Sequence, residues 1–127
     1  MGENYKAFSV TIEKLLEEKK YASLRDILTT INPADIALIF AEILEEKLPL
    51  LFRLLPKELA AEAFVEMDDD MQEHLIRGFS DAELKAVVDE LYVDDAVDIV
   101  EEMPANVVKR VLKQADPELR KMINEIL

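Results

Sequence analysis

The chain has 127 residues; half of them are hydrophobic, about a third are charged, and none is cysteine. This length suits one domain with a continuous core, and the lack of cysteine excludes disulfides and thiolate metal sites. The formal net charge of −13 disfavours nucleic acids and anionic membranes as partners and favours cations and basic proteins.

The first predicted elements are two helices at the amino-terminal end. Residues 6–19 form an amphipathic pattern, with Phe8, Ile12, Leu15 and Leu16 on one face. Residues 21–30 predict a shorter helix with its own apolar side. No apolar run approaches the length of a membrane span, so we expect no direct membrane insertion. We expect residues 1–22 to form a helix that caps the rest of the fold.

From Ile31 onward, apolar residues recur every twelve positions in three parallel rows, which start at Ile31, Ile39 and Phe40. The second row continues through Leu51, Ala63, Leu75, Val87, Ile99, Val111 and Ile123. In one unbroken helix, each step of twelve residues would turn the apolar stripe by roughly 120°, away from any partner. Each unit of twelve is therefore predicted to be a separate short helix.

The start of each unit carries residues typical of a helix start: Asn32-Pro33, Pro56, Asp68, Ser80-Asp81, Pro104 and Asp116-Pro117. Pro49 falls later in its unit, so we expect that helix to be the shortest. Helices of about two turns are unstable alone and must stack on their neighbours. The sequence therefore predicts an all-α solenoid in which residues 23–127 are stacked short helices, within a single domain of residues 1–127.

The stretch LYVDDAVDIVEEM, residues 91–103, holds five acidic residues and no basic one. Asp94, Asp98 and Glu101 are spaced i, i+4 and i+7, which places them on one helix face, away from the core positions. One interpretation is a solvated face that keeps the protein soluble. The other is half of a site for a hard cation such as Mg²⁺, which needs only one or two carboxylates from each side.

Other polar residues are better explained by structure. Asp68, Asp69 and Asp70 precede a helix, where capping and the helix dipole favour acids. His74 is the only histidine, so a zinc site is not expected. The sequence offers no catalytic base as a partner for any serine. A chain with two glycines also cannot build a glycine-rich phosphate-binding loop. We expect the chain not to be an enzyme.

Four segments together resemble the cytoplasmic N-terminal domain of MgtE-type magnesium transporters: INPADIALIF, LFRLLPKELAAEAFVEM, FSDAELKAVVDELYVDDAVDIVEEMP and LKQADPELRKMI. The resemblance covers about Leu24 to the end of the chain. It is fairly specific because the runs occur in order and at the right spacing. One departure is Asn32, where the family often has histidine.

The resemblance implies a right-handed superhelix of short helices in a bacterial protein, on the cytoplasmic side of the inner membrane. In that family a pair of CBS domains and a transmembrane pore follow, and the whole protein is expected to be a homodimer. Bridging Mg²⁺ ions would dock the acidic face on the CBS domains and favour pore closure. This fragment alone would bind Mg²⁺ weakly and transport nothing.

Matched residue by residue, the resemblance implies that Glu62, Asp94 and Asp98 contact Mg²⁺, with Asp95 and Glu101 as secondary candidates. The alternative function is a protein-interaction solenoid without a metal role, similar to the middle region of flagellar motor switch proteins. A downstream CBS pair and membrane helices would distinguish the two.

Overall fold

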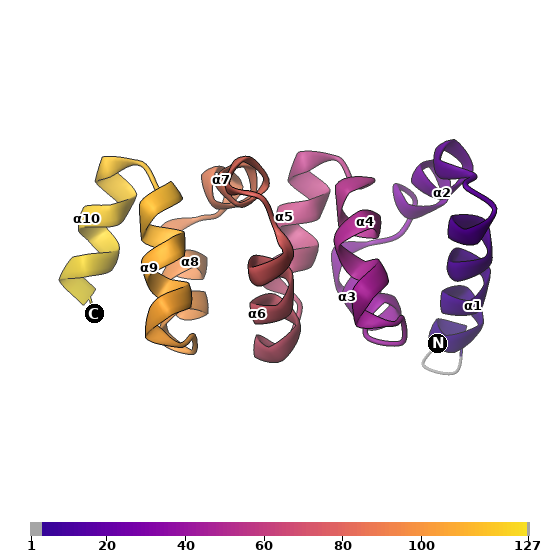
Figure 1. Ribbon diagram of the computed structural model, residues 1–127, viewed down its shortest axis with the longest axis horizontal. Coiled ribbons are helices and arrows are strands. Elements are labelled where there is room, and N and C mark those ends of the chain that lie inside the picture. The colour runs from indigo at the N-terminus through magenta and orange to yellow at the C-terminus, as the bar shows by residue number, and fades with distance from the viewer. Residues whose placement is uncertain (1–3, 127) are drawn as a thin grey trace. The chain divides into compact units, whose positions relative to one another are not determined.

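The computed structural model describes residues 4–126, and side chains for residues 5–125. Within that range every regular element is a helix (Figure 1), which confirms the predicted all-α class. Residues 1–3 of the predicted capping helix, and Leu127 at the end of the first apolar row, lie outside the described residues.

The chain divides into two compact units, one ending at Met67 and the other beginning at Asp68. The N-terminal unit holds α1 (Asn4–Glu17), α2 (Tyr21–Leu28), α3 (Pro33–Phe40), the 3₁₀ turn η1 (Glu45–Lys47), α4 (Leu48–Arg53) and α5 (Lys57–Val65). The C-terminal unit holds α6 (Asp69–Gly78), α7 (Asp81–Glu90), α8 (Val93–Glu101), α9 (Ala105–Gln114) and α10 (Pro117–Ile126). The single domain and its right-handed superhelix stay predictions.

Polar side chains start the helices where the sequence predicts. Asn32 and Asp68 each accept a hydrogen bond from a backbone N–H in the first turn of their helix. Ser80 and Glu83 form a capping box at the start of α7. Asp116 Oδ1 accepts from the backbone N–H of Leu119, with a distance of 2.8 Å. Because such caps satisfy backbone donors that have no partner within the helix, they fix where each short helix begins.

The core of the N-terminal unit contains three phenylalanine rings. Helix α1 packs against α2 and α3, and α3 packs against α5. Phe40, Phe52 and Phe64 are buried, and the rings of Phe52 and Phe64 meet edge to face with centroids 6.1 Å apart. Such a pair contributes about 0.5–1.5 kcal/mol beyond the area that it buries. The three rings thus add to a core that also buries aliphatic side chains such as Leu24 and Leu51.

The core of the C-terminal unit is mostly aliphatic, although Phe79 is buried there as well. Helix α7 packs against α9, while α8 packs against both α9 and α10. Every described member of the row that begins at Ile39 is buried, including Val87, Ile99, Val111 and Ile123 in this unit. Burying side chains of this size contributes about 1.5–3 kcal/mol each, so packing holds helices that are too short to be stable alone.

Two members of the predicted apolar face of α1 are not buried: Leu15 is half-buried, and Phe8 is exposed. Ile12 and Leu16 are buried, but Phe8 keeps 44% of its surface exposed. Phe8 lies beside a pocket in the N-terminal unit instead of under a neighbouring helix. The helical spacing identifies the face of α1 correctly, but not how far the covering helices extend along it.

Candidate functional site

Helix α8 begins without a side-chain cap. Tyr92, which precedes it, has an extended backbone, and its side chain makes no capping hydrogen bond and is 81% exposed. Asp94 and Asp95 lie in the first turn, where the positive end of the helix dipole favours acidic side chains by about 0.3–1 kcal/mol each. These two acids therefore help α8 to form, in addition to any role in binding.

The rest of α8 separates apolar from acidic residues. Ala96, Val97, Ile99 and Val100 are buried. Asp94, Asp98 and Glu101 are exposed on the opposite side, while Asp95 is half-buried. We call Asp94, Asp98 and Glu101 the acidic face. Like charges at this spacing cost about 0.2–0.5 kcal/mol per pair, far less than the burial of the apolar side contributes.

No basic side chain neutralises the acidic face. Among residues 5–125, neither a salt bridge nor a side-chain hydrogen bond involves any of its members. Two basic residues of the C-terminal unit pair with other acids: Arg77 with Glu73 at 2.9 Å and Lys85 with Asp89 at 3.2 Å. The negative potential of α8 is therefore available to a ligand from solution.

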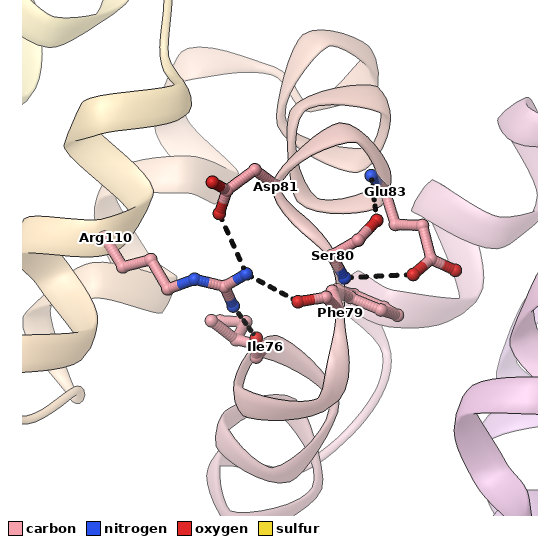
Figure 2. Close-up of polar contacts among 6 residues, drawn as sticks. All are labelled: Ile76, Phe79, Ser80, Asp81, Glu83 and Arg110. Carbon is pink, nitrogen blue, oxygen red and sulfur yellow. Dashed lines mark hydrogen bonds and ion pairs between the residues drawn. The ribbon is translucent and has the colours of Figure 1, made fainter.

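Arg110 shows how a basic residue of this unit is used instead (Figure 2). Its guanidinium group donates to the backbone carbonyls of Ile76 and Phe79, near the end of α6, and to Asp81 Oδ1 at 3.1 Å. The planar fork of arginine donors suits several acceptors at once. One charged group thus ties the end of α6 and the start of α7 to α9.

Arg120 has a similar role. Its Nε donates to the carbonyl of Leu112 at 3.0 Å, and its Nη2 donates to the carbonyl of Ala115 at 3.1 Å. It therefore satisfies carbonyl groups at the end of α9, which have no partner inside the helix. The sequence did not indicate either role, because the acceptors are backbone atoms that carry no residue signature, and those of Arg110 lie 31 and 34 positions away.

Glu62, the third predicted magnesium contact, lies on α5 in the N-terminal unit. It is exposed, while Ala60, Ala61 and Ala63 around it are buried. No described side chain pairs with it. The structure therefore groups Asp94, Asp98 and Glu101 on one helix and leaves Glu62 as a separate carboxylate of the other unit.

The acidic face supplies only some of the ligands that a bound metal ion needs. Across residues 4–126, no three acidic, histidine or cysteine side chains are placed to enclose an ion. Mg²⁺ prefers oxygen ligands, keeps several of its waters, and is commonly held by one or two carboxylates. Two exposed, unpaired aspartates on successive turns of α8 fit that incomplete coordination and do not form a closed site.

The other polar candidates serve the fold. Asp68 caps α6 as predicted. His74 is half-buried and has an interaction partner, so it is not a free ligand. None of the described helices is both long enough and apolar enough to span a bilayer. The acidic face of α8 is thus the strongest candidate for binding.

Comparison with known proteins identifies a matching family and a matching solved structure. The sequence model of the MgtE intracellular N domain matches residues 31–127. The solved structure of the cytosolic domain of the Mg²⁺ channel MgtE in complex with ATP matches with a TM-score of 0.77 and 27% sequence identity. That match covers 91% of this chain and 48% of the solved one, so this chain spans about half the length of its structural relative. None of the curated proteins compared with the chain matches it.

Proposed function

Because the chain belongs to the MgtE intracellular N domain family, we propose that it is a regulatory cytoplasmic domain of a magnesium channel or transporter. Within the whole protein, which we expect to be a homodimer in the inner membrane, it would sense Mg²⁺ and influence the pore. Transport would belong to the parts of the protein outside this fragment. The family match over residues 31–127 carries this proposal.

The sensing element we propose is the acidic face of α8. Asp94 and Asp98 would each hold a hydrated Mg²⁺ ion against carboxylates of the CBS domain pair, with Asp95 and Glu101 contributing to the potential. Glu62 would make a second contact of the same kind from α5. The support is that Asp94, Asp98 and Glu62 are exposed and that no described cation pairs with them.

In this proposal, two acidic surfaces repel each other, and a divalent ion bound between them turns the repulsion into attraction. At low Mg²⁺, an acidic surface of this chain and an acidic partner surface repel each other, so the docked state is disfavoured. At high Mg²⁺, ions held by one or two carboxylates from each side bridge the surfaces and favour docking and pore closure. Since each partner supplies only part of the coordination, the isolated chain would bind Mg²⁺ weakly.

This role needs no catalysis, and we propose that the chain is not an enzyme. Two of the three serines bond to the backbone: Ser9 Oγ donates to the carbonyl of Lys6, and Ser80 caps α7. A regulatory domain of this kind acts by changing which surfaces are in contact.

The direct test joins this chain to the CBS pair of its full-length protein and follows compaction by small-angle scattering as MgCl₂ is added. We expect the double variant Asp94→Asn/Asp98→Asn to need about tenfold more Mg²⁺ for compaction, because two charged contacts are lost. The matched control is Glu118→Gln/Glu125→Gln, which removes the same charge from exposed positions of α10 and should leave the midpoint unchanged.

Compaction of the Asp94/Asp98 variant at the wild-type Mg²⁺ concentration would show that these residues are not the contacts. Compaction that NaCl reproduces at equal ionic strength would show that screening, and not a bridging ion, drives docking. Partner binding that is indifferent to Mg²⁺ would favour the interaction solenoid instead.

A further inference from the structure

The N-terminal unit contains a pocket that the magnesium role does not use. It has a volume of about 290 Å³ and lies among α1, the end of α2 and the start of α3. Tyr5 and Phe8 line it from α1, and Ile27 lines it from α2. Ile31 and Asp35 complete the opposite wall. The pocket thus combines apolar walls with one carboxylate.

That carboxylate is held in a fixed position. Asp35 Oδ1 accepts a hydrogen bond from the Tyr5 hydroxyl at 2.8 Å, and Oδ2 accepts from Asn32 Nδ2 at 2.8 Å. Asn32 Oδ1 in turn accepts from the backbone N–H of Asp35 at 2.9 Å. The hydrogen bond to Asp35 also raises the pKa of Tyr5 above its ordinary value, at which the hydroxyl is already protonated at neutral pH.

Both side-chain donors to Asp35 are neutral, so its charge is offset only in part, by the positive end of the α3 dipole. No described lysine or arginine pairs with Asp35, and no basic residue lines the pocket. Each carboxylate oxygen has room for a further hydrogen bond, because an ionised carboxylate offers about four acceptor sites. A bound cation would therefore meet a pre-positioned, half-buried negative group.

The walls add a second requirement. Phe8 keeps 44% of its surface exposed, while Ile27 and Ile31 are half-buried. Covering these side chains with an apolar group is favourable, whereas a bare metal ion finds only one carboxylate and no further oxygen cage. Phosphate-bearing ligands are disfavoured by the charge of Asp35 and of the chain as a whole.

We propose that this pocket binds a small organic cation, an ammonium or guanidinium group carried on an apolar stem. The cation contacts Asp35, and the stem lies against Phe8 and Ile31. The volume is at the lower end of the range for small-molecule sites, which favours a compact ligand. This site is separate from the acidic face of α8, so either can exist without the other.

The test uses benzylammonium as the probe and follows backbone amide shifts by NMR. Benzyl alcohol, which lacks the charge, and methylammonium, which lacks the apolar stem, are the comparison ligands. We expect benzylammonium to perturb residues around Asp35 and Phe8 and to bind at least about tenfold more tightly than either comparison ligand. Equal binding of benzyl alcohol, or shifts centred outside the N-terminal unit, would overturn the proposal.

Variants identify the two contacts. Asp35→Asn keeps a hydrogen-bonding side chain and should weaken benzylammonium binding about tenfold. The control Asp26→Asn removes the same charge from an exposed position on α2 and should have no effect. Phe8→Ala changes a half-exposed residue, so the fold should survive, and binding should weaken about fivefold. Unchanged binding in Phe8→Ala would contradict the proposal even if Asp35→Asn did not fold.

A lysine side chain of a partner protein offers similar chemistry, so a blocked lysine amide serves as a second probe. It presents the same ammonium group but has a flexible aliphatic stem and no aromatic ring to cover Phe8. We therefore expect it to bind more weakly than benzylammonium. Tighter binding would assign the pocket to a protein side chain and overturn its assignment to a free small molecule.

Discussion

The two units differ in how they use their basic residues. The unit of residues 1–67 has twelve acidic and eight basic residues, while residues 68–127 hold sixteen acidic and seven basic ones. In the N-terminal unit, Lys47 lies 3.3 Å from a carboxylate oxygen of Glu13 and 3.4 Å from one of Glu17. In the C-terminal unit, Arg110 and Arg120 donate mainly to backbone carbonyls.

This difference explains the acidic face without any special feature of α8. Arg120 donates to backbone carbonyls, and seven basic residues are too few to pair with sixteen acidic ones. The C-terminal unit therefore has a stable aliphatic core beneath a surface of unneutralised charge. The core of the N-terminal unit holds three phenylalanine rings, and Lys47 of that unit pairs with two acids.

The largest expected effect separates the two cores. Phe64→Ala removes a side chain that is 2% exposed and packs edge to face on Phe52, so we expect unfolding free energy to fall by about 3–5 kcal/mol. Val88→Ala, two twelve-residue steps later in the C-terminal unit, removes fewer atoms and should cost about 2 kcal/mol. Urea unfolding measures both. Equal losses of unfolding free energy would show that the aromatic side chain contributes no more to its core than the aliphatic side chain does.

The next effect tests the role of arginine in the C-terminal unit. Arg110→Ala leaves two backbone carbonyls and Asp81 without their donor, so we expect a loss of about 2–3 kcal/mol. Arg77→Ala, which breaks an exposed pair with Glu73, should cost about 0.5 kcal/mol or less. If Arg110→Ala left hydrogen exchange in α6 and α7 unchanged, Arg110 would not be what holds the end of α6 and the start of α7 to α9.

A smaller effect depends on pH and belongs to the N-terminal unit. The side-chain hydrogen bond to Glu13, with a further contribution from Glu17, raises the pKa of Lys47 above its ordinary value. A raised folded-state pKa stabilises the fold below the unfolded-state pKa, and this stabilisation is lost as pH rises through the folded-state pKa. Wild-type stability should therefore fall relative to Lys47→Gln above about pH 10.5. If the difference in unfolding free energy between wild type and Lys47→Gln stayed constant across alkaline pH, folding would not raise the pKa of Lys47.

The smallest effect concerns the acidic face in the isolated chain. Asp98→Asn relieves repulsion with Asp94 at i, i+4 and should stabilise the chain by about 0.3 kcal/mol. Asp94→Asn relieves the same repulsion but loses a favourable first-turn contact with the helix dipole, so we expect almost no net change. Thermal unfolding of both variants, without divalent ions, measures the difference. Destabilisation by Asp98→Asn would indicate a partner that the structure does not show.

The sequence predicts what depends on local chemistry. The caps at Asn32, Asp68 and Ser80 were recognisable because a side chain binds backbone only three residues away. The buried row from Ile39 was recognisable because its spacing matches one helix face per unit. The acidic face of α8 followed from the same helical geometry.

What the sequence did not predict depends on distant segments. The acceptors of Arg110 lie more than thirty positions away, and backbone carbonyls have no sequence signature. The exposure of Phe8 depends on where α2 and α3 leave α1 uncovered. The pairing of Tyr5 with Asp35, also 30 positions apart, is a tertiary contact of the same kind.

The central claim is that unpaired carboxylates of α8 form half of a magnesium site. A residue-resolved NMR titration of the isolated chain with MgCl₂, against NaCl at equal ionic strength, tests it most directly. We predict weak, divalent-specific shifts centred on Asp94 and Asp98 that vanish in the double asparagine variant. Identical shifts with NaCl, or a response centred on other acidic residues, would contradict the account.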